Sequence, residues 1–395
     1  MAPVAVVAQG LVCAAGRGIE AYAAALRDNR SALVPNDWSR VALACAIGRV
    51  AGIEDEPLPP AWSDWDCRAT RLAWAALQTD GFAAAVAAAR ARWGAARVGL
   101  VLGTSASTIA ASERAYREPA PDGGFPADAR FEPLHTLHGV TDFVARALAL
   151  EGPSATVSAA CASSAKAYAQ AERWLRLGLA DAVVVGGVDA LSESLLFGFH
   201  ALQLVDAGPC RPCDARRAGI SVGEAAGFAL LQRGAGPWML LGHGEANDAH
   251  HLSAPHPQGL GAELALDAAL ARAGIDAAAI DYLALHATAT PRNDAVEAAL
   301  VARRYGPEVH ASATKGASGH AMGAAAMLQA LACGIALRDG VGAGSPGCES
   351  VDPAFGPVFA RQLRLRPAPR RVRLAASHAF GFGGNNCVLV FGAAT

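Results

Sequence analysis

The chain has 395 residues, 53% hydrophobic and 17% charged, so it is long and apolar enough to bury a substantial core. Its 33 basic and 35 acidic residues give a formal net charge of −2 without a basic stripe, which argues against nucleic acid as a partner. The segment MAPVAVVAQG lacks the features of a signal peptide, and no uncharged apolar stretch approaches ~18 residues. We therefore expect a soluble, cytoplasmic protein that does not enter a membrane.

Short apolar runs alternate with alanine-rich stretches along the first half of the chain. Strands are predicted in VAVVAQGLV, RVGLVLG, ATVSAAC and ADAVVVGGVDA, and helices in RLAWAALQ and ASSAKAYAQAERWLRLG. The polar stretches 117–128 and 206–217 are predicted to be long surface loops. This alternation is typical of an α/β protein in which helices cover a sheet.

The second half repeats this order from Trp238 onward. A strand is predicted over 238–244, followed by the helix ELALDAALARAGI, which Gly274 closes. DYLALHATAT predicts a strand that leads into a polar turn, and VHASATKGASGHAMGAAAMLQALACGIAL predicts a strand, a small-residue turn and a long helix. This last segment parallels the one around Cys161, which indicates an internal duplication with halves at 1–235 and 236–395.

Cys161 lies where an apolar strand meets a helix, in VSAACASSAKA. A cysteine at such a turn meets the first amides of the helix, and the helix dipole favours its thiolate form. The nine cysteines are scattered and odd in number, so they do not indicate a disulfide framework, and most are expected to be small buried hydrophobes. A buried structural cysteine is the alternative at position 161, but the turn favours a nucleophile.

Two histidines follow in similar surroundings. His286 ends an apolar strand in LALHATATPRND, and His320 shares a tight turn with Lys315 in TKGASGHAMGAAA. Lys166 and Lys315 are the only lysines among the basic residues, which points to positions where a compact ammonium serves better than a guanidinium. Taken alone, each histidine fits a structural role as well as a catalytic one.

Polar and glycine-rich residues surround these histidines. The hydroxyls of Thr288 and Thr290 alternate and can face one ligand, while Asp294 and Glu297 can orient a neighbouring ring or cation. Near the C-terminus, SHAFGFGGNN contains three glycines that allow close approach of the main chain to a ligand. A loop of this kind can supply an amide to an oxyanion hole, although a plain turn before the last strand is the alternative.

In this order, the segments resemble the β-ketoacyl-acyl-carrier-protein synthases of the thiolase superfamily over nearly the whole chain. The matching motifs are VSAACASSA, GPCRPCDARRAGISVGEAAGFALL, HATATPRND, KGASGHAMGAA and FGFGGNN. The resemblance implies an α/β thiolase fold, five-layered αβαβα, built from two related halves. It also implies decarboxylative Claisen condensation of a malonyl carrier with an acyl group held as a thioester, in fatty acid or polyketide elongation.

The resemblance further implies a role for each matching residue. Cys161 takes the acyl group, while His286 and His320 assist decarboxylation and stabilise the enolate. Lys315 holds the His320 region in place and lends positive charge. The amides of Cys161 and Phe382 form the oxyanion hole, and Phe382 also gates the acyl pocket.

Substrate and partner follow from the same resemblance. Thr288 and Thr290 are expected to bind the pantetheine arm, which arrives on an acyl carrier protein, so the enzyme needs no cofactor of its own and no metal. Members of the family dimerise, and either a homodimer or a heterodimer with a chain-length-factor-like subunit is expected. The alternative is that this chain is itself the non-catalytic chain-length-factor-like partner, but it retains the reactive residues that such partners replace.

The chain departs from the family pattern at several positions. Ala287 and Ala289 replace the glycines of HGTGT, and Gln329 replaces a glutamate that pairs with the lysine. Asn385 is a mild change in the glycine-rich loop, and Ser112 is expected near the floor of the acyl pocket, where a bulky apolar residue is common. GTSAS, CASSAK and HATATP together look most like the synthases that build aryl polyene pigments.

Other motifs carry less weight. Cys210 and Cys213 have CxxC spacing, but no second pair accompanies them, so a surface loop is expected rather than a metal site. Gly186 and Gly187 lack the rest of a dinucleotide fingerprint. A coenzyme A-dependent thiolase is disfavoured because Cys387 lies beyond the glycine-rich loop rather than within it.

Overall fold

The computed structural model describes residues 2–126, 129 and 132–394. In the first half, the long strands are β1 (Val4–Cys13), β5 (Val98–Gly103), β6 (Ser154–Val157), β7 (Ala182–Asp189) and β8 (Ala225–Arg233). They pair in the order β6-β5-β7-β8-β1. β5 runs parallel to β6 and β7, whereas β8 runs antiparallel to β7 and β1.

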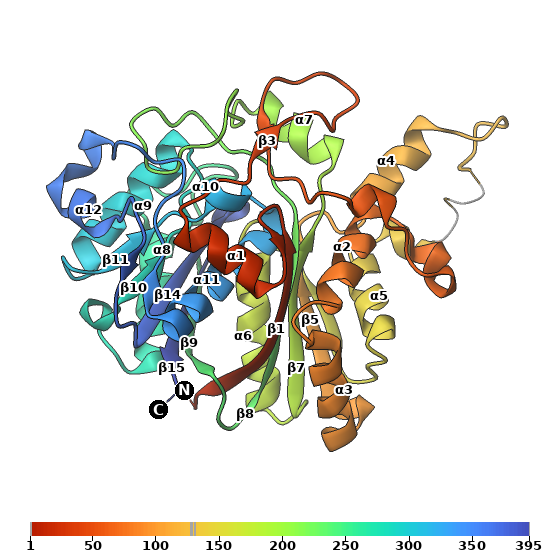
Figure 1. Ribbon diagram of the computed structural model, residues 1–395, viewed down its shortest axis with the longest axis horizontal. Coiled ribbons are helices and arrows are strands. Elements are labelled where there is room, and N and C mark those ends of the chain that lie inside the picture. The colour runs from red at the N-terminus through yellow and green to blue at the C-terminus, as the bar shows by residue number, and fades with distance from the viewer. Residues whose placement is uncertain (1, 127–128, 130–131, 395) are drawn as a thin grey trace.

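The second half repeats this arrangement strand for strand (Figure 1). Its long strands are β9 (Trp238–Asn247), β10 (Tyr282–Ala284), β11 (His310–Ser312), β14 (Leu374–Gly381) and β15 (Asn385–Ala393). The order β11-β10-β14-β15-β9 and the strand directions match those of the first half. β1 pairs with β9, so one continuous sheet joins the two halves.

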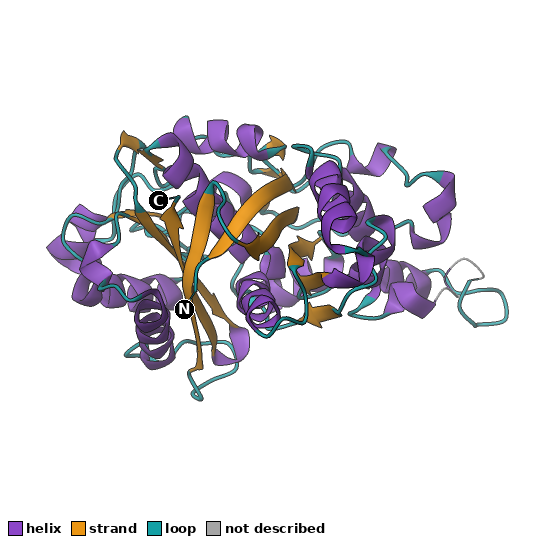
Figure 2. Cartoon of the chain, turned by 90° about the horizontal axis from the view of Figure 1, so that it is seen from below, coloured by secondary structure: helices purple, strands orange, loops and turns teal. Residues whose placement is uncertain are grey.

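Helices form three layers around the strands, two outside and one between. The outer helices of the first half are α2 (Arg68–Leu77), α3 (Phe82–Trp93) and α5 (Gly139–Ala147), and those of the second half are α8 (Leu260–Ala273), α9 (Pro291–Arg304) and α12 (Gly356–Gln362). The middle layer holds α1 (Ile19–Arg27), α6 (Ser163–Arg176) and α11 (Ala325–Asp339). Figure 2 shows helices both outside and between the two groups of strands, which is the expected αβαβα layering.

The alanine content of the middle layer explains how α6 and α11 fit side by side between the strands. α11 is buried from Ala325 to Ala336, and α6 packs with it in one hydrophobic cluster that includes strands of both halves. Small side chains let these backbones approach closely while keeping the interior densely packed. The remaining helices are α4 (Ile109–Arg117), α7 (Glu193–Ala201) and α10 (Lys315–Ser318). The short strands are β2 (Gly16–Arg17), β3 (Val34–Pro35), β4 (Ala46–Ile47), β12 (Val341–Gly342) and β13 (Ala368–Pro369).

The predicted strands and helices are confirmed, and Gly274 ends α8 in the left-handed conformation. The prediction of a surface loop over 206–217 is wrong at its centre, because Cys210, Cys213 and Asp214 are buried. Asp214 accepts hydrogen bonds from the amides of Glu349 and Ser350, which draws the loop inward. The other predicted loop is mostly exposed from 118 to 126, and residues 127 and 128 lie outside the described residues.

Among the described residues, no single helix is both long and apolar enough to cross a membrane. In the described part of the chain, one pair of helices, α2 and α3, passes the same test together, but it is bent by 72°.

Candidate active site

Cys161 lies on the tight connection between β6 and α6. Ala160, just before it, has a φ of +49°, a left-handed conformation that turns the chain sharply into the helix. Gly381, at the end of β14, packs against this turn: a Cβ there would lie 3.1 Å from the Cys161 amide nitrogen. The nucleophile turn is therefore fixed from both sides, by its own backbone and by the start of the glycine-rich loop.

His320 and Lys315 lie on the corresponding connection of the second half, between β11 and α11. Lys315 begins the short helix α10, and the His320 amide donates a hydrogen bond to the carbonyl of Ser221. Because β6–α6 and β11–α11 occupy equivalent places in the two halves, the N-termini of the two central helices bring Cys161 and His320 together.

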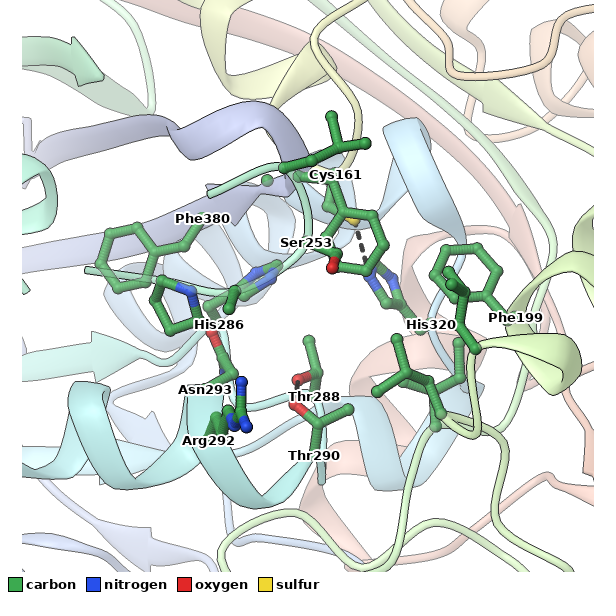
Figure 3. Close-up of a pocket in the computed structure, with 18 of the residues that line it drawn as sticks. Cys161, Phe199, Ser253, His286, Thr288, Thr290, Arg292, Asn293, His320 and Phe380 are labelled. Carbon is green, nitrogen blue, oxygen red and sulfur yellow. Dashed lines mark hydrogen bonds between the residues drawn. The ribbon is translucent and has the colours of Figure 1, made fainter. Parts of the chain in front are cut away.

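The reactive side chains converge at one end of a cavity (Figure 3). His320 Nε2 lies 3.0 Å from Cys161 Sγ, and the ring centroids of His286 and His320 are 5.7 Å apart. One ligand atom from each of Cys161, His286 and His320 lies within 4.8 Å of the other two. The structure thus assembles a thiol and two imidazoles that are far apart in the sequence.

Burial controls the ionisation of the thiol. It raises the pKa of Cys161 to about 11, against the opposing effects of the Lys315 charge and the amides of Phe382 and Cys161. The sequence-based expectation that the helix would favour the thiolate is therefore wrong for the resting site, because desolvation outweighs it. The same two amides do point toward the sulfur, as an oxyanion hole beside it requires.

Both imidazoles are neutral near physiological pH. Burial first, and then the charge of Lys315, holds the pKa of His286 and that of His320 well below the ordinary value. Burial also lowers the pKa of Lys315 to about 8. Neutral imidazoles can each donate one hydrogen bond and accept another.

The two imidazoles differ in what surrounds their second nitrogen. Lys315 Nζ lies 3.4 Å from His286 Nδ1 and also donates to the His286 carbonyl. Since an ammonium only donates, Nδ1 must accept, and the proton of His286 stays on Nε2. His320 Nδ1 has no hydrogen-bond partner within the described residues, so the protein leaves the tautomer of His320 free.

Lys315 has partners in spite of the missing glutamate. Gln329 Oε1 accepts a hydrogen bond from Lys315 at 3.2 Å, while Gln329 Nε2 donates to the carbonyls of Leu285 and His378. Among the charges around Lys315, that of Glu297 has the largest effect in raising the pKa of Lys315 against the effect of burial. Gln329 therefore orients the lysine, and the balancing charge comes from another residue.

Glu297 and Asp294 support different parts of the site. Glu297 accepts hydrogen bonds from the amides of His286 and Ala287 at 2.8 and 2.7 Å, so it holds the histidine turn directly. Asp294 accepts from the Cys213 amide at 2.8 Å, and burial raises its pKa to about 6. Asp294 thus anchors the buried loop beside the site.

The cavity that ends at Cys161 has a volume of about 410 Å³. Thr288 and Thr290 line it, with their hydroxyls 2.9 Å apart, and Figure 3 shows both on the side away from Cys161. Phe382 also lines it and contacts the ring of Phe199 on α7 at a centroid distance of 5.6 Å. A long, narrow arm can therefore reach the thiol between the threonines and the aromatic pair.

Comparison with known proteins decides the family. The description "Beta-ketoacyl synthase, N-terminal domain" matches residues 64–235, and "Beta-ketoacyl synthase, C-terminal domain" matches residues 239–349. The chain belongs to the β-ketoacyl synthase family. It is accordingly a condensing enzyme of the acyltransferase class.

Several relatives agree with this assignment. Nodulation protein E of Rhizobium meliloti (strain 1021) is 34% identical over 307 residues, which is 75% of each chain. The mitochondrial 3-oxoacyl-[acyl-carrier-protein] synthase of Arabidopsis thaliana is 34% identical over 66% of this chain and 61% of its own length.

A solved structure is similar over almost the whole chain. It is the ketosynthase ApeO in complex with its chain length factor ApeC from Xenorhabdus doucetiae, which has a TM-score of 0.88 and 32% identity over 99% of this chain and 98% of that chain. The ishigamide ketosynthase/chain length factor has a TM-score of 0.85 and 26% identity over 99% of both chains.

Two departures from the family pattern gain a physical meaning in this β-ketoacyl synthase. Ala287 and Ala289 have φ values of +31° and +66°, so the positions where the motif has glycine do require a left-handed backbone. Ser112 does not line the cavity; it lies on α4 and contacts His135 Nδ1 at 2.8 Å. The expectation that it forms the floor of the acyl pocket is wrong for this chain, because its helix directs it toward η5 (Glu132–His135).

The residues behind Glu297 were not predicted from the sequence. His378 on β14 contacts Glu297 at 2.9 Å, and Tyr305, after α9, contacts His378 at 2.7 Å. Phe199, which faces Phe382, was also missed. His378 carries a signal in the sequence, since it lies within SHAFGFGG two residues before Phe380, whereas Tyr305 and Phe199 lie in no motif.

Proposed function

We propose that this enzyme condenses a malonyl group on an acyl carrier protein with an acyl group held on Cys161, releasing carbon dioxide and a 3-oxoacyl carrier. The observation that carries the proposal is the convergence of Cys161, His286 and His320 in one cavity. The non-catalytic alternative leaves this arrangement without a use.

Acyl loading begins from the neutral thiol. As Cys161 Sγ attacks the donor thioester carbon, its proton passes to His320 Nε2, 3.0 Å away. The amides of Cys161 and Phe382 stabilise the oxyanion. When the tetrahedral intermediate collapses, the carrier thiol leaves with that proton, and His320 is neutral again.

Decarboxylation then uses the second substrate, the malonyl carrier. The thioester oxygen accepts hydrogen bonds from His286 Nε2–H and from His320, which can carry its proton on Nε2 because no described residue bonds to its other nitrogen. The carbon–carbon bond to the carboxylate breaks, carbon dioxide leaves, and the enolate carbon attacks the Cys161 thioester. The thiolate of Cys161 departs and takes up one proton through His320, which restores the resting site.

Sequence relatives and similar solved structures support the carrier protein and the second subunit in this proposal. Curated relatives are named 3-oxoacyl-[acyl-carrier-protein] synthases, which favours a carrier-bound substrate. The similar ketosynthases were solved with a chain length factor, which favours a heterodimer over a homodimer and an aryl polyene or related polyketide pathway over primary fatty acid synthesis.

The test offers the purified enzyme, alone and with its candidate chain-length-factor-like subunit, malonyl carrier and either a straight-chain or an aryl polyene acyl carrier. Mass spectrometry of the carrier measures the 3-oxoacyl product. We expect condensation with the aryl polyene acyl group to be the faster reaction. Equal or better elongation of ordinary fatty acyl chains contradicts the pathway, and no product with any acyl carrier contradicts the proposed function itself.

A further inference from the structure

A buried chain of hydrogen bonds runs behind His286, away from the cavity. Tyr305 Oη lies 2.7 Å from His378 Nε2, and His378 Nδ1 lies 2.9 Å from Glu297 Oε1. The two oxygens of Glu297 then accept the amides of His286 and Ala287. All five residues are buried, so water does not compete with these bonds.

The proton positions along this chain follow from donor and acceptor types. Because the Glu297 carboxylate only accepts, His378 Nδ1 must carry a proton. His378 Nε2 then accepts from the Tyr305 hydroxyl, and a neutral imidazole satisfies both bonds. The carboxylate receives three donors, so its position is fixed by both the turn that it supports and the imidazole behind it.

The surroundings show why the position of this carboxylate matters. Glu297 lies on α9 and Tyr305 directly follows that helix, while His378 on β14 joins the two by hydrogen bonds. The ring of Phe380 lies 5.0 Å from that of His378 and 5.8 Å from that of His286, measured between centroids. With Gln329 in place of a carboxylate beside Lys315, Glu297 serves both the lysine charge and the histidine turn.

A purely packing role explains these residues poorly. An apolar side chain of similar volume fills a buried site in a strand without any need for partners, whereas a buried imidazole with an unmatched nitrogen is costly. His378 has both nitrogens matched, and one of its two partners is the residue that holds His286. The hydrogen bonds of His378 therefore serve to hold Glu297 rather than only to fill space.

We propose that His378 and Tyr305 are positioning residues that hold the Glu297 carboxylate beneath the His286–Ala287 turn, and so aim His286 Nε2 at the malonyl thioester. This inference rests on the proposed role of His286 in decarboxylation. It separates the two half-reactions, because acyl loading uses Cys161, His320 and the oxyanion hole but not the turn that Glu297 supports.

Two substitutions of His378 test its two ring nitrogens separately. In His378→Gln, the amide takes the place of Nε2, so the bond to Tyr305 can form and the bond to Glu297 is lost. In His378→Asn, the amide takes the place of Nδ1, so a donor to Glu297 remains. Decarboxylation is measured as carbon dioxide released from malonyl carrier, and loading as the acyl adduct on Cys161 by intact mass.

We expect His378→Gln to lower the ratio of decarboxylation to loading about ten-fold or more, the scale of one hydrogen bond to a charged group. His378→Asn should recover most of the ratio, and Tyr305→Phe should lower it by a few-fold. The matched control is His310→Asn, which removes the bond between another buried imidazole and the Ala343 carbonyl. We expect that control to lower thermal stability and to leave the ratio unchanged.

The outcomes separate this inference from the proposed function. An unchanged ratio in folded His378→Gln overturns the positioning role, as does an equal fall in His310→Asn. If His378→Gln does not fold, Tyr305→Phe decides in the same way. A wild-type enzyme that neither loads nor decarboxylates contradicts the proposed function instead.

Discussion

The two central strand-to-helix connections occupy the same place in the two halves of the molecule, but they differ in length. Residues 158–162 join β6 to α6 and carry Cys161, whereas residues 313–324 join β11 to α11 and carry both Lys315 and His320. The repeated strand order directs both helix N-termini to one point. The duplicated fold therefore brings the two connections together, and the longer connection of the second half adds the side chains of Lys315 and His320 to the site.

The same comparison extends to charge. Burial acts on both connections, but it raises the pKa of Cys161 to about 11 and lowers that of Lys315 to about 8. The thiol of Cys161 in the first half therefore stays neutral over the whole working range of pH. Lys315 in the second half can lose its proton, and so its positive charge, within that range.

The largest expected effect is a difference between His286 and His320 in which half-reaction each one serves. His286→Ala removes a donor to the enolate oxygen, so decarboxylation of malonyl carrier should fall about 10²- to 10³-fold while loading of Cys161 changes only a few-fold. His320→Ala should slow both half-reactions, because His320 contacts Cys161. Rates of carbon dioxide release and adduct formation measure the difference, and an equal loss of loading in both variants contradicts the division of roles.

A smaller effect comes from pH. Lys315 is cationic below about pH 8, so decarboxylation should decline as pH rises through that value, about ten-fold per unit above it. Loading should show no such decline, since the thiol of Cys161 keeps its proton to about pH 11. Pre-steady-state rates of each half-reaction from pH 6 to 10 test this. If the decarboxylation rate of Lys315→Met still declines near pH 8, the titration belongs to another group.

The smallest effect concerns backbone strain. Ala160 in the first half and Ala289 in the second both have positive φ, but Ala160 is partly exposed and Ala289 fully buried. Ala160→Gly should raise the free energy of unfolding by about 1 kcal/mol, because glycine adopts this conformation without strain. In Ala289→Gly, the loss of a buried methyl, about 0.8 kcal/mol, offsets that gain. Denaturant unfolding measures both, and equal changes contradict the offset.

Local patterns were enough to predict much of the fold, since the strand-helix alternation indicated two related halves. The turn at Cys161 favoured a nucleophile, but the roles of His286 and His320 followed from the order of the motifs, which resembles the family, because either histidine alone fits a structural role as well. Residues that act through tertiary contacts were harder to find. The Tyr305–His378–Glu297 chain joins segments more than 70 residues apart in sequence, and only the pairing of β14 with β10 and the packing of α9 bring it behind His286.

Two errors have the same origin. The helix dipole at Cys161 depends on the turn alone, whereas desolvation of the thiol depends on every residue that covers it. Ser112 was expected near the pocket floor from the family resemblance, but on α4 it contacts His135 and does not line the cavity. In both cases the outcome depends on neighbours that no local pattern contains.

The most direct test of the central claim is intact-mass analysis of wild type and Cys161→Ala after exposure to an acyl carrier, with peptide mapping of any adduct. The account predicts one acyl group per wild-type chain, on the peptide that contains Cys161, and none in the variant. An adduct that persists in Cys161→Ala would contradict the assignment of the nucleophile and the mechanism built upon it.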